Sequence, residues 1–114
     1  MDKQKLNLFL DRLLEKTKEG KLEWETTVNK STFLVGLQDT AISVAKVSDD
    51  QYIFDFRNNM GDIVDLVIIS KKDFPVEEFS ENEYGKAKQI FDLARQQSLK
   101  GEQTFERILE QLAA

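Results

Sequence analysis

Four short runs between positions 24 and 56 alternate between apolar and polar side chains, and a fifth run over residues 62–69 is almost continuously apolar. Segments of only two or three residues, rich in Asn, Asp and Ser, separate these runs. A period of two is typical of half-buried β-strands. Parallel strands need connections of about a dozen residues, so connections this short allow only antiparallel neighbours. The sequence therefore predicts a five-stranded antiparallel meander.

Helical patterns flank the strand region on both sides. Over residues 3–19, apolar side chains recur at spacings of three and four, and Gly20 follows where a glycine commonly ends a helix. The same spacing returns over residues 84–112, after a Ser80 and Glu83 pair that matches the capping box at the start of a helix. One helix before the strands and two after them are therefore expected.

The length and composition fit a single globular domain. With 114 residues, 40% of them hydrophobic, the chain can bury a core without disulfides. No long linker or low-complexity tract divides it. We therefore predict one α+β domain over residues 1–114, with the order α-β-β-β-β-β-α-α and with the helices mainly on one face of the sheet.

The lengths of the hairpin loops predict how the strands pair. The registers that fit these loops keep the large apolar side chains on one face, which the helices should cover. In the last hairpin, Gly61 is expected to adopt the left-handed conformation. The predicted pairs on this inner face include Val35 with Ile42, Val44 with Phe54, and Phe54 with Leu66.

The same registers place small, aliphatic and acidic residues on the opposite, outer face of the sheet. There Asp55 is expected opposite Asp65, and like charges across a strand pair cost stability unless something compensates them. Such a pair could share a proton or hold a hard cation. Alternatively, both aspartates are solvated, with Arg57 close enough to offset part of the repulsion. The candidate partner-binding residues on this face are Leu34, Ala45, Ile53, Asp55, Asp65 and Val67.

Two further apolar features have alternative interpretations. Trp24 could anchor a partner, although packing against the first helix is the preferred interpretation. The apolar stripe from Phe105 to Leu112 could bind a partner helix, but we expect it to cover the domain's own sheet.

The composition excludes many kinds of chemistry. With no Cys and no His, the chain has no thiol nucleophile, no zinc finger and neither the commonest metal ligand nor the commonest general base. Phosphate-loop and dinucleotide-binding motifs are absent as well. We therefore expect no catalytic residues, no metal and no cofactor. Two alternatives remain: an enzyme that uses Asp55 and Asp65 as its acid pair, and a carrier that binds a small molecule or lipid between sheet and helices.

The charge distribution argues against nucleic-acid and membrane partners. The chain carries 16 basic and 21 acidic residues, and four bases against eight acids fall within residues 21–70. No basic cluster is available to neutralise phosphates or anionic lipids. The N-terminal stretch does not resemble a signal peptide, and the longest aliphatic run, residues 66–69, is far too short to cross a bilayer. We therefore expect a cytoplasmic protein without nucleic-acid or membrane partners.

The order of the elements is similar to that of many small uncharacterised bacterial α+β proteins. The stretches that carry this resemblance are Leu13–Thr17 with Leu22–Glu25, and the helices over Tyr84–Leu112. The resemblance implies the fold but no activity. The residues themselves favour a small intracellular, non-enzymatic protein-interaction module of the adaptor, immunity or regulatory type. It would bind through the outer sheet face or the edge strand 21–28, either to a protein partner or to a second copy as a homodimer. The acidic border of the outer face favours a basic partner.

Overall fold

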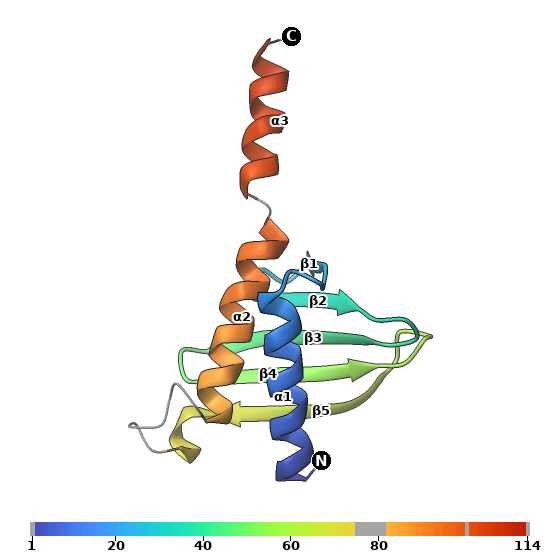
Figure 1. The fold of residues 1–114 in the computed structure, drawn as a ribbon, viewed down its shortest axis with the longest axis vertical. Helices are drawn as coiled ribbons and strands as arrows, with labels where there is room; N and C mark the ends of the chain where they lie inside the picture. The colour runs from blue at the N-terminus through green and yellow to red at the C-terminus, as the bar shows by residue number, and fades with distance from the viewer. Residues whose placement is uncertain (1, 75–81, 100, 114) are drawn as a thin grey trace.

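The computed structural model describes residues 2–74, 82–99 and 101–113, with the exception of the side chains of residues 101–106. Helix α1 precedes five strands, a short 3-10 turn and two helices (Figure 1). The predicted α+β class and element order are confirmed. The elements are α1 (Lys3–Lys18), β1 (Trp24–Thr26), β2 (Thr32–Gly36), β3 (Ala41–Ser48), β4 (Gln51–Arg57), β5 (Ile63–Ser70), η1 (Lys71–Asp73), α2 (Glu83–Leu99) and α3 (Gly101–Ala113).

The five strands form one open antiparallel sheet in the order β1-β2-β3-β4-β5. The predicted meander is therefore confirmed. Val35 pairs with Ile42, and Val44 pairs with Phe54, as the loop lengths predicted. The first strand is shorter than the pattern over residues 21–28 suggested, because only Trp24–Thr26 pairs with β2.

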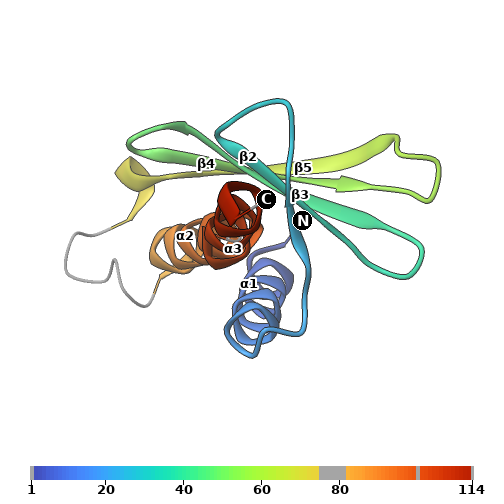
Figure 2. The ribbon, with the colours of Figure 1, turned by 90° about the horizontal axis from the view of Figure 1, so that it is seen from above.

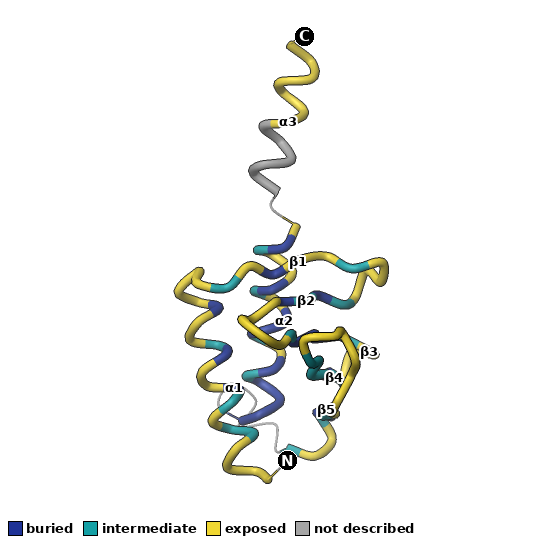
Figure 3. The backbone as a smooth tube through the Cα atoms, turned by 90° about the vertical axis from the view of Figure 1, so that its right-hand side faces the viewer, coloured by how far each residue is buried: buried dark blue, intermediate teal, exposed yellow. Residues whose placement is uncertain are grey.

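Helices α1 and α2 lie side by side on one face of the sheet, and no helix in the described part of the chain lies on the opposite face (Figures 1 and 2). Buried residues gather between the helices and the sheet, whereas most of β5 is exposed (Figure 3). Aromatic rings fill this layer. The ring of Phe9 on α1 lies 5.8 Å from that of Phe54, and the ring of Phe91 on α2 lies 5.4 Å from Phe33 and 5.5 Å from Tyr52.

Helix α3 extends away from the domain beyond the end of α2 (Figure 1). Its described apolar side chains Ile108, Leu109 and Leu112 are all exposed. The expectation that this stripe covers the domain's own sheet is therefore wrong for these three residues. The side chain of Phe105 lies outside the described part of the chain.

Local hydrogen bonds mark the helix ends. At the end of α1, the Gly20 N–H donates to the Thr17 carbonyl and the Lys21 N–H donates to that of Lys16. Gly20 has a left-handed φ of 71° and follows the helix, as its place in the sequence predicted. At the start of α2, the Asn82 side chain accepts a 2.9 Å hydrogen bond from the Gly85 N–H. Ser80 of the predicted capping box lies outside the described residues.

The register between β4 and β5 differs from the prediction by one residue. The turn is as expected: Gly61 has a φ of 85°, the Asn58 side chain accepts hydrogen bonds from two backbone N–H groups, and Arg57 pairs with Ile63. The next pair, however, joins Phe56 to Asp65, so Val64 forms a bulge. All later residues of β5 therefore point to the face opposite the predicted one.

Candidate functional site

The bulge at Val64 gives the outer face of the sheet an aliphatic surface. Leu66 and Ile68 project from β5 on this face with 51% and 53% of their surface exposed. Across the sheet Leu66 is opposite Asp55, and Ile68 is opposite Ile53, which itself pairs with Ala45. We call five of the aliphatic residues of this face the outer-face patch, and they are Leu34, Ala45, Ile53, Leu66 and Ile68.

Four of the six predicted site residues lie together on the outer face as expected, namely Leu34, Ala45, Ile53 and Asp55. The other two do not. Val67 pairs with Phe54 and packs against the core, and Asp65 pairs with Phe56 on the helix-facing side of the strand. The sequence reasoning missed Leu66 and Ile68. The only signal for them was the uninterrupted apolar run of residues 66–69, which fits either register equally well.

The proposed carboxylate pair of Asp55 and Asp65 is therefore wrong. Instead, Asp55 faces Arg57 two residues along the same strand, and the Arg57 Nε donates a 3.1 Å hydrogen bond to Asp55 Oδ1. The two side chains are only 16% and 32% exposed, so solvent screens this ion pair less than a surface pair. The Asp55 carboxylate therefore has an opposite charge, not a like charge, as its neighbour.

This pairing predicts different effects for the two aspartates. Asp55→Asn removes the charge that Arg57 binds in a partly buried place, so we expect the free energy of unfolding to fall by about 1 kcal/mol. Asp65→Asn should change it by less than about 0.5 kcal/mol, because the amide oxygen can still accept the Leu66 N–H that Asp65 Oδ1 accepts at 2.8 Å. Urea denaturation of both variants measures this difference. Equal effects would contradict the register.

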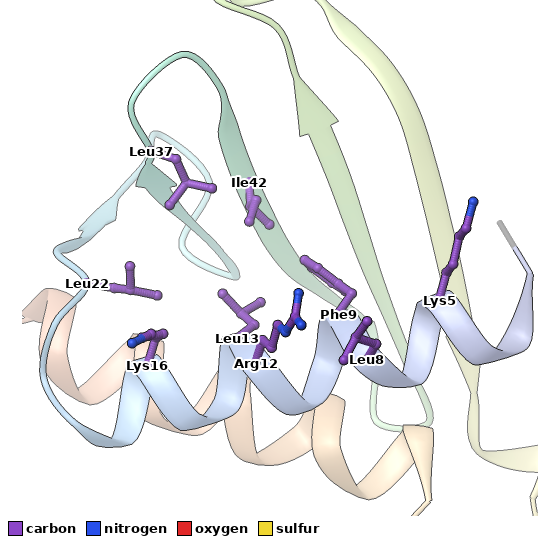
Figure 4. A pocket seen from close by; sticks show the side chains of 9 residues that line it. All are labelled: Lys5, Leu8, Phe9, Arg12, Leu13, Lys16, Leu22, Leu37 and Ile42. Atoms are coloured by element: carbon purple, nitrogen blue, oxygen red, sulfur yellow. The ribbon is translucent and has the colours of Figure 1, made fainter.

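A groove opens between α1 and the inner face of the sheet, with a volume of about 370 Å³ (Figure 4). Its wall is apolar, and two of its residues, Leu8 on α1 and Leu37 after β2, are 48% and 44% exposed. Three basic side chains of α1 line it as well: Lys5, Arg12 and Lys16. This end of the sheet is therefore incompletely covered by the two helices.

Among the described residues, no group of three or more carboxylates could hold a metal ion. No helix in the described part of the chain has the length and apolarity needed to cross a membrane. The chain was also compared with protein-family models, with curated proteins and with solved structures, and no match was found in any of the three.

Proposed function

We propose that this chain is a non-enzymatic protein-interaction module that binds a protein partner through the outer-face patch. The observation that carries the proposal is the exposure of Leu66 and Ile68 beside the half-buried Ile53, on a face that no described helix covers. Single exposed aliphatic residues are common on proteins. A contiguous group of them on one sheet face is typical of an interaction surface.

The free edge of β5 adds a second means of recognition. β5 is the last strand of the sheet, and among the described residues only β4 pairs with it, so no described strand lies beside its other edge. An extended segment of a partner could pair with this edge through main-chain hydrogen bonds. Since Leu66 and Ile68 belong to the same strand, such a segment would also contact the patch.

The charges around the patch favour a partner with basic residues at its rim. Glu25 is exposed and pairs with Leu34 at one side of the outer face, and the chain as a whole has a net charge of −5. Arg57 is already engaged by Asp55. Complementary charge at the rim of an interface raises association rates and selects among partners, while the apolar centre provides the affinity.

The two alternative functions have less support. The enzyme alternative depended on Asp55 lying opposite Asp65, which is not the case. The carrier alternative could use the groove beside α1, whose volume of about 370 Å³ falls within the usual range of ligand pockets, roughly 300–1,000 Å³.

Quantitative co-purification from cells of the native host tests the proposal. We expect Leu66→Arg/Ile68→Arg to lose the partner that the wild-type chain enriches, because two charges would then lie at the centre of the interface. Its thermal stability should stay close to that of the wild-type chain, since both side chains are half exposed. The matched control is Val28→Arg, which places the same charge on a fully exposed apolar residue in a turn.

The control variant should retain the partner. Binding that survives in Leu66→Arg/Ile68→Arg, or the absence of any protein that distinguishes this variant from Val28→Arg, would contradict the proposed function.

A further inference from the structure

Helix α3 has an apolar face whose described side chains are exposed. The helix is 13 residues long, and Ile108, Leu109 and Leu112 are 47%, 51% and 80% exposed. Isolated helices shorter than about 12–15 residues are marginal in water, and most helices in proteins depend on packing of their apolar face. A surface that covers this face is therefore needed for α3 to be stably helical.

The groove beside α1 has the complementary properties. Its wall presents the half-exposed Leu8 and Leu37, and it lies beneath an end of the sheet that α1 and α2 leave open (Figure 4). A helix laid along α1 would cover this apolar wall, as an amphipathic helix does in other groove complexes. The groove thus has an uncovered apolar wall, and α3 has an uncovered apolar face that could cover it.

The charges of the two surfaces are also complementary. Lys5 and Arg12 border the groove, and neither has an ion-pair partner among the residues that the structure describes. Residues 101–114 contain three acidic residues and one basic residue, and Glu110 lies on the described part of α3. An acidic helix is thus favoured in this groove over a basic or neutral one.

The α3 helix of the same chain cannot reach the groove. α2 ends at Leu99 and α3 begins at Gly101. The Cα atoms of these two residues are therefore at most about 7.6 Å apart. The groove lies on the far side of α1: Asp11 of α1 binds Lys86 of α2, whereas Leu8 and Arg12 line the groove. Packed helices are themselves about 8–10 Å apart, so α3 would have to pass around α1.

We propose that this protein forms a two-fold homodimer in which α3 of each copy occupies the groove beside α1 of the other. The exchange is reciprocal, so it closes at two copies and buries both apolar surfaces. The dimer uses α1, the adjoining end of the sheet and α3, and it leaves the outer-face patch free. It therefore does not depend on the function proposed above.

Sedimentation equilibrium of the full chain tests the dimer. We expect a mass of twice 13.2 kDa for the wild-type chain. Leu112→Arg on α3 and Leu8→Asp in the groove should each weaken dimerisation by about ten- to a hundredfold, because each removes one apolar side chain from both of the equivalent contacts between α3 and the groove. Gln111→Arg, which adds the same charge to an exposed polar position of α3, and Leu66→Arg/Ile68→Arg should both remain dimeric.

A disulfide experiment identifies the occupant of the groove directly, because the chain has no cysteine of its own. The variant Leu8→Cys/Leu109→Cys should form a covalent dimer on oxidation far more readily than Leu66→Cys/Leu109→Cys. It should also cross-link more readily than Leu109→Cys alone, which would cross-link if two α3 helices paired with each other.

Three results would overturn the proposal. The first is a wild-type chain that stays monomeric at high concentration. The second is a dimer that Leu8→Asp leaves intact, which would mean that α3 pairs elsewhere. The third is a monomer that binds a fluorescent fatty acid in a manner abolished by Leu8→Asp, which would make the groove the site of a small-molecule carrier. These results do not depend on the outer-face patch. A negative result of the co-purification test with Leu66→Arg/Ile68→Arg would neither support nor contradict the dimer.

Discussion

Trp24→Ala should lower the free energy of unfolding by about 3–5 kcal/mol, the cost of removing a large buried aromatic side chain. Trp24 is only 1% exposed, which confirms its predicted place in the core. Its Nε1–H donates a 3.2 Å hydrogen bond to Thr17 Oγ1, which in turn donates to the Leu13 carbonyl at 2.7 Å. Gln97 Nε2 of α2 donates to the Thr17 carbonyl at 2.8 Å, so these contacts join β1 to both helices.

The hydrogen bond can be separated from the packing. Thr17→Val should lower the free energy of unfolding by about 1–3 kcal/mol, because it leaves the buried Trp24 Nε1–H without an acceptor. Thr17→Ser keeps the hydroxyl group and should cost less. Urea denaturation followed by circular dichroism measures all three variants, since Trp24 is the one tryptophan of the chain and its fluorescence is lost in Trp24→Ala. A loss below about 1 kcal/mol for Trp24→Ala would contradict this account of the core.

The second large effect is a loss of stability at alkaline pH that depends on Tyr52. Burial raises the pKa of the Tyr52 hydroxyl to about 12, from 10.0 in an ordinary tyrosine. The neutral phenol is thus the form that the folded state favours. The stabilisation that the neutral Tyr52 phenol provides is complete below pH 10, and it is lost as the pH rises from 10 towards 12. Each pKa unit corresponds to about 1.4 kcal/mol, and with partial solvent screening we expect a loss of about 2 kcal/mol.

Tyr52→Phe provides the control. Tyr84, whose pKa is also raised by burial, adds to the alkaline loss in both proteins. Lys21 and Lys88 add to it as well, because hydrogen bonds to Glu19 and Asp92 raise their pKa values. The difference in free energy of unfolding between wild type and Tyr52→Phe should therefore shift in favour of the variant between pH 9 and pH 12. Urea denaturation at a series of pH values measures this shift. A difference that stays constant would contradict the burial of the Tyr52 hydroxyl.

Much of the fold could be predicted from local patterns. The short loops excluded parallel connections, and the alternation around Val44 and Phe54 determined the register of the first hairpins because a shift of one residue would have buried polar side chains. Gly20 and Gly61 marked turns that require a positive φ. In these segments only one arrangement buries the apolar side chains and leaves the polar ones exposed, and the structure has that arrangement.

The differences arose where the pattern allowed two arrangements. In β5, apolar residues at 66, 67, 68 and 69 can face either side, so the bulge at Val64 decided which of them are exposed. That single residue removed Asp65 and Val67 from the candidate site and added Leu66 and Ile68. For α3, its amphipathic pattern correctly predicted a helix, but no pattern shows which surface such a helix covers. Tertiary geometry, which here keeps α3 away from its own sheet, decides this.

Hydrogen–deuterium exchange of the chain, alone and bound to the partner that it captures, tests the central claim that the outer face of the sheet is the binding surface. We predict that binding slows exchange in peptides covering β5 and β4, where Leu66, Ile68 and Ile53 lie. Exchange in the exposed turn around Val28 should not change. Slower exchange confined to α1 and α2, with β5 unaffected, would contradict the claim.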